Sequence, residues 1–247
     1  MKTLIVLPTY NEAENLPKLV SAVFSLDQSI SLLVVDDASP DGTGELADLL
    51  AEEHPERVFV LHREGKQGLA SAYIEGFQVA LQMDLDAIGM MDSDFSHAPE
   101  KLPEMIAALE NADLVIGSRY VSNGSVDRNW PVWRKWLSAF GNSYARTILG
   151  IKVNDVTTGY RLWRKEKLQT FPLNKVLSSG YVFLVELVYL ATRLGYRIVE
   201  VPIYFADRKW GKSKMDLRIQ AEAAFRVWHV LWAHRGVHQE TSAPESR

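Results

Sequence analysis

Short apolar runs alternate with amphipathic stretches through the first 118 residues. Five runs rich in aliphatic and β-branched residues predict strands at Thr3–Leu7, Leu32–Val35, Val58–Leu61, Ala87–Met91 and Leu114–Ile116. They are apolar throughout rather than alternating, as expected of strands buried on both faces. Helical periodicity and start signals predict helices near Glu14–Leu26, Gly44–Glu53, Gly68–Leu81 and Pro99–Leu109. This order predicts an α/β fold with a mainly parallel sheet.

The second half of the chain has a less regular pattern. The predicted elements are a Trp- and Arg-rich segment at Asn129–Trp136, a helix to about Leu149, a turn at Asp155–Arg161, a helix near Val182–Leu194, a strand at Arg197–Tyr204, a basic loop at Asp207–Lys214 and an amphipathic helix to about Trp232. Because no flexible linker interrupts these elements, the sequence predicts one domain over residues 1–236, with a flexible tail at 237–247.

Polar residues follow each predicted strand of the first half. They are Pro8–Glu12, Asp36 and Asp37, Arg63–Lys66, Asp92-Ser93-Asp94, and Ser118–Tyr120. In an open parallel sheet, ligands bind at the carboxyl ends of the strands. We therefore expect these residues to line a single site.

Composition excludes several classes of protein. The 247 residues are 47% hydrophobic and 23% charged, as in ordinary globular domains, and the chain contains no cysteine. A thiolate nucleophile and a Cys-ligated metal are therefore excluded. The Gly-rich signatures of dinucleotide and P-loop sites and the G-x-S-x-G elbow of α/β hydrolases are also absent from the sequence. We expect neither a signal peptide nor a transmembrane helix, and hence a cytoplasmic or peripheral protein.

The formal charge of −4 conceals a strong asymmetry along the chain. Residues 1–118 contain 21 Asp and Glu against 6 Lys and Arg, a charge of −15, whereas residues 119–247 contain 10 against 21, a charge of +11. The segment from Arg128 to Asn154 has five basic residues and no acidic one. This asymmetry predicts that the second half meets an anionic partner: nucleic acid, a phosphorylated substrate or an acidic membrane face.

The Asp92-Ser93-Asp94 motif is the strongest candidate for chemistry. Its two carboxylates are suited to a hard divalent cation that also binds phosphate oxygens. Asp36 and Asp37 add a second acidic strand end, so the pattern favours a nucleotide diphosphate bound through a metal. The alternative is that these acids are solvated loop residues or helix N-caps.

Motifs across nearly the whole chain resemble one family, the inverting nucleotide-sugar glycosyltransferases of GT-A fold, and within it the dolichol-phosphate mannosyltransferases. The motifs are Pro8-Thr9-Tyr10-Asn11-Glu12, Val35-Asp36-Asp37, Ser39-Pro40-Asp41-Gly42-Thr43, Met91-Asp92-Ser93-Asp94, Gly117-Ser118-Arg119-Tyr120, Trp130-Pro131 to Ser138, Thr158-Gly159-Tyr160-Arg161, Gly180-Tyr181-Val182-Phe183 and Gly211-Lys212-Ser213-Lys214. The resemblance implies a Rossmann-like GT-A domain with C-terminal amphipathic helices, in which residues 1–118 bind the nucleotide sugar and residues 119–236 the acceptor.

The resemblance also implies a role for individual residues. Guanine and ribose of GDP-mannose would be held by Pro8, Tyr10, Glu12, Val35 and Asp37, and the pyrophosphate and a Mg or Mn ion by Asp92, Ser93 and Asp94, with Ser96 as a further candidate ligand. The acceptor phosphate would be gripped by Arg119, Arg134 and Ser138, and the donor phosphates by a mobile loop carrying Arg208 and Lys214. Arginine and lysine are suited to these phosphate contacts.

The implied reaction transfers mannose from GDP-mannose to a polyprenyl (dolichyl-type) phosphate with inversion, releasing GDP. Because the acceptor phosphate, with a second pKa of about 6, is already largely ionised near neutral pH, no general base is required. Alternatives are a UDP-glucose-dependent polyprenyl-phosphate glucosyltransferase, another family 2 glycosyltransferase, or a non-catalytic nucleotide-sugar binding module. A nucleic-acid binder would leave the acidic half unexplained.

Two segments predict contact with a membrane surface. Trp130, Trp133, Trp136, Leu137, Phe140 and Tyr144 are interleaved with Arg134, Lys135 and Arg146, and Phe225, Trp228, Leu231 and Trp232 occupy the last helix. They are typical of interfacial helices, although such stripes also occur in cores. A small membrane-anchoring subunit is a possible partner.

Asp155 and Arg161 are expected to form a structural ion pair.

Overall fold

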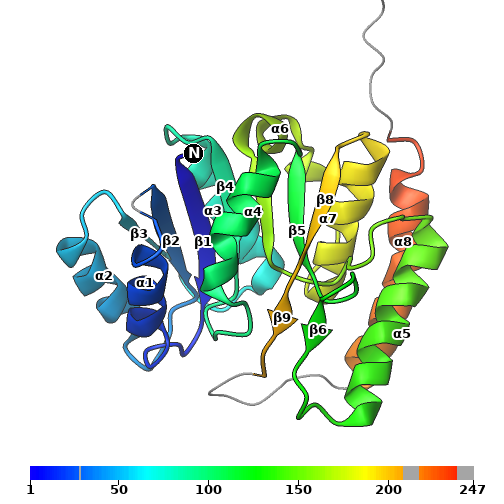
Figure 1. The fold of residues 1–247 in the computed structure, drawn as a ribbon, viewed down its shortest axis with the longest axis horizontal. Coiled ribbons are helices and arrows are strands. Elements are labelled where there is room, and N and C mark those ends of the chain that lie inside the picture. The colour runs from blue at the N-terminus through cyan, green and yellow to red at the C-terminus, as the bar shows by residue number, and fades with distance from the viewer. Residues whose placement is uncertain (28, 208–216, 238–247) are drawn as a thin grey trace, which may run out of the picture.

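A seven-stranded sheet forms the centre of the computed structural model, which describes residues 1–27, 29–207 and 217–237 (Figure 1). Its strand order is β3-β2-β1-β4-β7-β5-β8. The strands are β1 (Thr3–Thr9), β2 (Ile30–Asp36), β3 (Val58–His62), β4 (Ala87–Met90), β5 (Leu114–Ser118), β7 (Arg161–Arg164) and β8 (Ile198–Pro202). Only β7 runs antiparallel to its neighbours. The predicted α/β fold with a mainly parallel sheet is confirmed.

Helices cover both faces of the sheet, as Figure 1 shows. One face carries α1 (Leu16–Phe24), α2 (Thr43–Glu53) and α4 (Leu102–Leu109), the last preceded by a 3-10 turn at Pro99–Lys101. The other face carries α3 (Leu69–Leu81), α6 (Lys165–Thr170) and α7 (Tyr181–Arg193), with α5 (Val132–Leu149) and α8 (Leu217–His234) beyond them; a second 3-10 turn spans Leu173–Lys175.

Side chains of β1 alternate between the two cores, which explains why its sequence is apolar throughout. Leu4 and Val6 pack with α3 and α7, whereas Ile5 and Leu7 pack with α1 and α4. Gly76 of α3 lies against β1, where an added Cβ would come within 2.5 Å of a Val6 methyl carbon. The small residue therefore allows α3 to approach the sheet closely.

The structure differs from the predicted elements mainly in the second half. The predicted turn at Asp155–Arg161 leads into β7, which was not predicted, and the predicted strand Arg197–Tyr204 divides into β8 and β9 (Tyr204–Phe205). β9 pairs with β6 (Ser125–Val126) in a separate two-stranded sheet. β7 has only four residues with an arginine at each end, so its sequence lacks the apolar run that identifies a buried strand.

Helices α5 and α8 pack side by side at one end of the molecule (Figure 1). The Tyr144 hydroxyl of α5 donates a hydrogen bond to the Ala224 carbonyl at 3.2 Å and accepts one from Trp228 Nε1 at 2.9 Å. None of the helices in the described part of the chain is long and apolar enough to cross a membrane. The predicted flexible tail falls almost wholly outside the described residues.

Candidate active site

The loops after β1, β2 and β4 meet at the carboxyl edge of the sheet. Ser93 Oγ donates a hydrogen bond to the Pro8 carbonyl at 3.2 Å, which ties the β4 loop to β1. The Asp37 backbone N–H donates to the Thr9 carbonyl at 3.1 Å, which ties the end of β2 to β1. The structure thus brings the predicted acidic segments together at one edge.

Three non-glycine residues with left-handed backbone lie in these loops. Asn11, Ala38 and Phe95 have φ angles of 62°, 53° and 63°, one in the loop after each of β1, β2 and β4. Such backbone is costly for residues with a Cβ and occurs where the surrounding structure requires it, frequently at functional sites. The turn at Phe95 folds the chain back so that Ser96 reaches Asp94.

The carboxylates of the Asp92-Ser93-Asp94 motif differ in their surroundings. Asp94 is buried, and its Oδ1 accepts hydrogen bonds from the backbone N–H of Ser96 at 3.0 Å and from the Ser96 hydroxyl. The Asp92 side chain is 32% exposed. Ser96 therefore orients Asp94, and its predicted role as a further metal ligand stays a prediction.

His97 is a buried neutral residue behind Asp92. Its Nδ1 accepts the backbone N–H of Asp92 at 3.0 Å, and its ring stacks on Tyr160 with ring centroids 4.9 Å apart. Burial lowers the pKa of His97, in agreement with the accepting role of Nδ1. His97 thus supports the start of the motif from inside the protein.

Asp37 forms a buried ion pair with Arg63, which the sequence placed among the site-lining residues but gave no individual role. Arg63 also donates to both carboxylate oxygens of Glu75 at 3.0 Å and to Ser71 at 2.7 Å. Burial raises the pKa of Asp37, and the Arg63 charge opposes that rise. The position of Arg63 directly after the third strand was the available signal, since that is where ligand-facing residues lie.

The other predicted nucleotide contacts occupy different depths. The Tyr10 ring lies under the Lys66 ammonium group, 3.7 Å from its centroid, and Glu12 accepts a 2.7 Å hydrogen bond from Asn15. Val35 is fully buried in the core under α3, so its side chain does not face the carboxyl edge of the sheet. Any contact that Val35 makes with a nucleotide has to come from its backbone.

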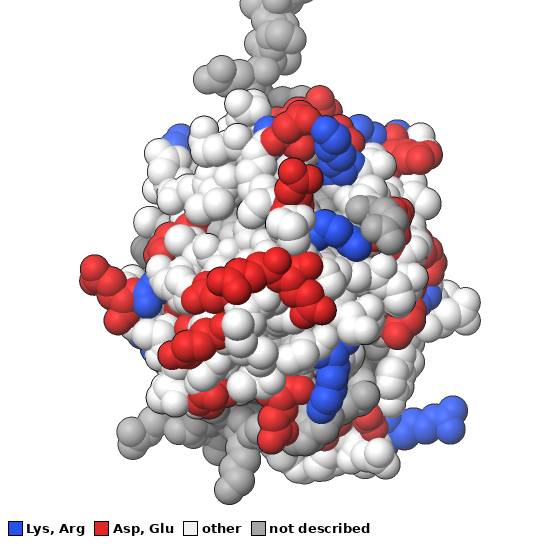
Figure 2. Space-filling view, turned by 90° about the vertical axis from the view of Figure 1, so that its left-hand side faces the viewer, with Lys and Arg blue, Asp and Glu red and all other residues white. Residues whose placement is uncertain are grey.

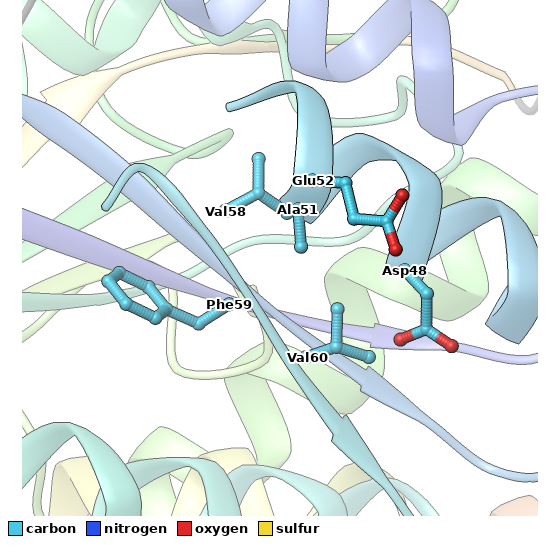
Figure 3. A pocket seen from close by; sticks show the side chains of 6 residues that line it. All are labelled: Asp48, Ala51, Glu52, Val58, Phe59 and Val60. Atoms are coloured by element: carbon cyan, nitrogen blue, oxygen red, sulfur yellow. The ribbon is translucent and has the colours of Figure 1, made fainter. Parts of the chain in front are cut away.

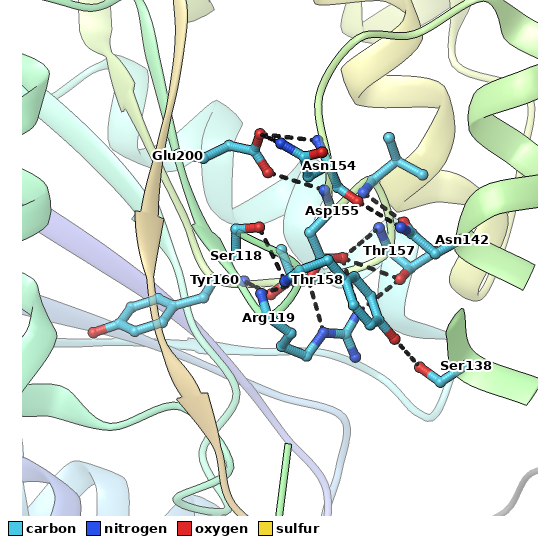
Figure 4. A network of polar contacts seen from close by, with 12 residues as sticks. Ser118, Arg119, Ser138, Asn142, Asn154, Asp155, Thr157, Thr158, Tyr160 and Glu200 are labelled. Carbon is cyan, nitrogen blue, oxygen red and sulfur yellow. Dashed lines mark hydrogen bonds and ion pairs between the residues drawn. The ribbon is translucent and has the colours of Figure 1, made fainter. Parts of the chain in front are cut away.

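Arg119 is held by Asp155 in a buried, bidentate ion pair (Figure 4). Its Nε and Nη2 donate to the two carboxylate oxygens at 2.7 and 2.8 Å, and Nη2 also reaches Thr157 at 2.6 Å. The expected ion pair between Asp155 and Arg161 is wrong, because Arg161 donates to the carbonyls of Thr158 and Val156. Tertiary structure supplies an acid that the local sequence of Arg119 lacks.

Glu200 of β8 fixes the turn that carries Asp155. It accepts hydrogen bonds from the backbone N–H groups of Asn154 and Asp155 at 2.8 and 3.0 Å. Asn142 of α5 binds the same turn through the Asn154 carbonyl and the Val156 N–H. The network in Figure 4 therefore joins β5, β8 and α5 around Arg119.

The remaining acceptor candidates lie at the start of α5. The Ser138 hydroxyl is 2.7 Å from the Tyr120 hydroxyl. Arg134 donates to Asp207 at 3.0 Å and lies over the Trp130 ring, 3.7 Å from its centroid. Trp130 is itself buried, so it belongs to the protein interior and not to an interfacial stripe. Arg208 and Lys214 lie outside the described residues.

A hollow lies away from this edge, between α2 and β3 (Figure 3). It is lined by Asp48, Ala51, Glu52, Val58, Phe59 and Val60. Acidic side chains gather on this side of the molecule, as Figure 2 shows, and α2 contributes the exposed Glu45, Asp48, Glu52 and Glu53. An open, acidic hollow at the lateral edge of the sheet has no group suited to a phosphorylated ligand.

The donor set at the carboxyl edge fits a hard cation that is shared with a ligand. Across residues 1–27, 29–207 and 217–237, no group of three or more His, Asp or Glu side chains is placed to hold a metal. Asp92 and Asp94 offer two carboxylates, and Mg²⁺ is usually bound by one or two carboxylates together with substrate phosphates. These residues therefore suit a metal whose other ligands come from a diphosphate.

Comparison with known proteins identifies relatives over almost the whole chain. The family model described as Glycosyl transferase family 2 matches residues 4–171. A polyprenol monophosphomannose synthase of Mycolicibacterium smegmatis is 47% identical over 236 residues, covering 95% of this chain and 88% of the relative. An undecaprenyl-phosphate mannosyltransferase of Micrococcus luteus is 47% identical over 245 residues, covering 96% and 100%.

Solved structures support the fold. The crystal structure of glucosyl-3-phosphoglycerate synthase from Mycobacterium tuberculosis with Mn²⁺, UDP-glucose and phosphoglyceric acid has a TM-score of 0.66 and 19% sequence identity. The match covers 97% of this chain and 81% of that one. At this identity the likeness concerns the fold alone.

Proposed function

The chain belongs to glycosyl transferase family 2, and from this premise we propose that it transfers mannose from GDP-mannose to a polyprenyl phosphate with inversion. The observation that carries the proposal is the Asp92-Ser93-Asp94 motif, held against the β1 loop at the ligand-binding edge of the sheet. The 47% identity to two mannosyltransferases with polyprenyl acceptors supports the choice of sugar and acceptor.

The donor is assigned to the carboxyl edge of the sheet, where the loops after β1, β2 and β4 meet. Asp37 and Tyr10 would contact the nucleoside, and Arg63 would hold the Asp37 carboxylate in place. Asp92 and Asp94 would hold a Mg or Mn ion, which when bound neutralises charge on the diphosphate leaving group. Arg208 and Lys214 are proposed to contact the donor phosphates.

The acceptor is assigned to the part of the carboxyl edge that β5 and α5 form. Arg119 and Arg134 bring positive charge there, but each already has a carboxylate partner, Asp155 or Asp207. The Arg134–Asp207 pair is only partly buried, so a phosphate dianion can compete for it. Arg119 is buried with Asp155, so it would contribute to acceptor binding a guanidinium whose position is fixed.

Catalysis in this arrangement depends on position and electrostatics. The phosphate acceptor is ionised at neutral pH, so the protein needs no base to activate it. The side chains of Arg134 and Ser138 would align the acceptor oxygen behind the anomeric carbon, while Asp92 and Asp94 fix the diphosphate. A single displacement of this kind inverts the configuration of the sugar.

The first test is transfer of radiolabelled mannose from GDP-mannose to a short polyprenyl phosphate in detergent, with Mn²⁺ or Mg²⁺. We expect labelled lipid in the presence of metal and loss of more than about 90% of the product when EDTA is added, because the diphosphate loses its counter-charge. UDP-glucose is assayed in parallel. Glucolipid in place of mannolipid would overturn the choice of sugar, and product formation that is indifferent to EDTA would overturn the metal assignment.

The packed helices α5 and α8 both expose large apolar side chains, which together are called the apolar face: Val132, Trp133, Trp136 and Phe140 of α5 and Phe225, Trp228 and Trp232 of α8. Trp136, Phe140 and Phe225 are 74%, 67% and 77% exposed. Lys135 and Arg146 lie on the same helix as the α5 residues, at the end of the molecule opposite the acidic α2 side. We propose that this face docks on an anionic, cytosolic membrane surface, where a polyprenyl acceptor is found.

Replacement of Trp133 and Trp136 by serine should weaken vesicle binding at least about 10-fold, because two large apolar side chains would no longer enter the interface. The measurement is co-sedimentation with vesicles containing phosphatidylglycerol, compared with phosphatidylcholine alone. Leu49→Ser is the matched control, since Leu49 is also exposed but lies on α2. Equal binding of the double variant and the wild type would contradict the assignment of this face.

A further inference from the structure

Tyr73 of α3 is a buried hydroxyl group that the proposed reaction leaves without a role. Its ring is fully buried between Phe77 and Phe183, with ring centroids 6.1 and 6.3 Å away. Its hydroxyl oxygen makes no hydrogen bond of full geometry with any described residue. A buried polar atom in this state is uncommon and costly, so it needs an explanation.

The charges of Asp92 and Arg161 both act on the Tyr73 hydroxyl. Burial raises its pKa, the Asp92 carboxylate raises it further, and the Arg161 guanidinium lowers it. The opposite effects of the two charges show that the Tyr73 hydroxyl is within electrostatic reach of both Asp92 and Arg161.

The strand register places Arg161 on the same face of the sheet as Tyr73. Arg161 of β7 pairs with Met90 of β4, two residues before Asp92. Trp163, two residues along β7, packs in the same core as Tyr73, whereas Leu162 packs on the opposite face. Because side chains alternate along a strand, Arg161 points toward α3.

Arg161 is a fully buried cation with an incomplete set of partners. Nε and Nη2 donate to the Thr158 and Val156 carbonyls at 3.0 Å, whereas Nη1 has no partner among the described residues. Burial lowers the pKa of Arg161 to about 9, so the group is still charged at neutral pH. An unused N–H donor thus lies near an unused hydroxyl, which in turn lies near a carboxylate.

We propose that Tyr73 is a positioning residue that holds the Asp92 carboxylate: Arg161 Nη1–H donates to the Tyr73 oxygen, and the Tyr73 O–H donates to Asp92. These two hydrogen bonds would give a partner to both buried atoms. The inference rests on the proposed function, because it assumes that Asp92 holds a cation together with a nucleoside diphosphate.

The hydrogen bonds from Arg161 through Tyr73 to Asp92 would strengthen cation binding and would not change the transfer step itself. A carboxylate fixed by a hydrogen bond from behind has fewer orientations to lose when it binds a metal, and loss of such a supporting partner typically weakens metal affinity 10- to 100-fold. Gly159 lies next to Asp92, since an added Cβ would make ordinary van der Waals contact with Asp92 Oδ1 at 3.5 Å.

The test is Tyr73→Phe, which removes one oxygen atom and keeps the ring. Mn²⁺ affinity is measured in the presence of GDP from the electron paramagnetic resonance signal of free Mn²⁺. We expect the Mn²⁺ Kd to rise about 10-fold, with kcat at saturating Mn²⁺ within about 2-fold of wild type. We also expect the metal-free melting temperature to fall only slightly, because the two hydrogen bonds of the Tyr73 hydroxyl are lost while the ring and its packing are kept.

Phe77→Leu is the matched control, one helical turn away in the same core. It should lower the melting temperature and leave the Mn²⁺ Kd unchanged. An unchanged Mn²⁺ Kd in Tyr73→Phe would overturn the positioning role alone. A wild-type protein that binds no Mn²⁺ with GDP would overturn the metal assignment as well, so the two failures are distinguishable.

Discussion

Asp94→Asn should reduce mannosyl transfer at least about 100-fold, while the protein remains folded. The amide keeps an oxygen that can accept the hydrogen bonds of the Ser96 backbone and hydroxyl, so the local turn is preserved. What is lost is the negative charge that would hold a cation against the diphosphate. The measurement is the initial rate of lipid product at saturating GDP-mannose, together with the melting temperature.

The matched control for this variant is Asp84→Asn, the same chemical change at an exposed residue that contacts Lys2 far from the crevice. It should retain wild-type rates. An initial rate of transfer by Asp94→Asn within about threefold of the wild-type rate would show that Asp94 has no catalytic role. It would also favour a nucleotide-sugar binding module whose acids have no catalytic role.

Asp155→Asn should lower the free energy of unfolding by about 3–5 kcal/mol, the usual cost of breaking one side of a buried ion pair. Asp155 accepts from Arg119 Nε and Nη2 on its two oxygens, and in asparagine one of these oxygens becomes an NH₂ donor. A donor then faces a donor, and the Arg119 charge stays buried without a counter-charge. For a chain of this size we expect the melting temperature to fall by roughly 10 °C.

The stability difference should also depend on pH. Burial alone would raise the pKa of Asp155, but the Arg119 charge and hydrogen bonds outweigh it and hold the pKa below the ordinary value of 3.8. A lowered carboxyl pKa stabilises the fold above the unfolded pKa, and this stabilisation is lost as the pH falls through the folded pKa. The gap between wild type and Asp155→Asn should be constant near pH 6–8 and narrow below about pH 4.

Asp84→Asn again serves as the control. Because Asp84 is exposed, the melting temperature of this variant should stay close to that of the wild type across the same pH range. A melting temperature of Asp155→Asn within about 2 °C of wild type would show that Arg119 finds another partner or reaches water. In that case the network in Figure 4 would not be needed to fix Arg119 and the turn that carries Asp155.

The strands and helices of the first half were predicted well for a physical reason. Strands buried on both faces need uninterrupted apolar residues, and the helices that cover them need amphipathic periodicity, so both patterns are visible locally. β7 escaped prediction because a strand inserted between β4 and β5 can have polar ends when tertiary contacts satisfy them. Arg161 is such a case, since its hydrogen bonds go to carbonyls of the preceding turn.

The chemical identity of the candidate site was also visible in the sequence. Asp92 and Asp94 follow a buried strand, and the rule that ligands bind at strand ends in parallel sheets makes their location predictable. Their roles, and those of Arg134 and Ser138, stay predictions until the variants are measured. Arg208 and Lys214 lie outside the described residues.

Only the tertiary structure shows which charged residues form ion pairs with one another. The sequence around Arg119 and Arg134 is free of acids, yet Asp155 and Asp207 reach them from 36 and 73 residues away. Arg63 reaches Asp37 in the same way, across elements distant in the chain. Local pattern determines which segments are buried and which edge is polar, because burial and periodicity are properties of neighbouring residues. Ion pairs and supporting hydroxyls depend on how the buried elements pack, so only the folded chain specifies them.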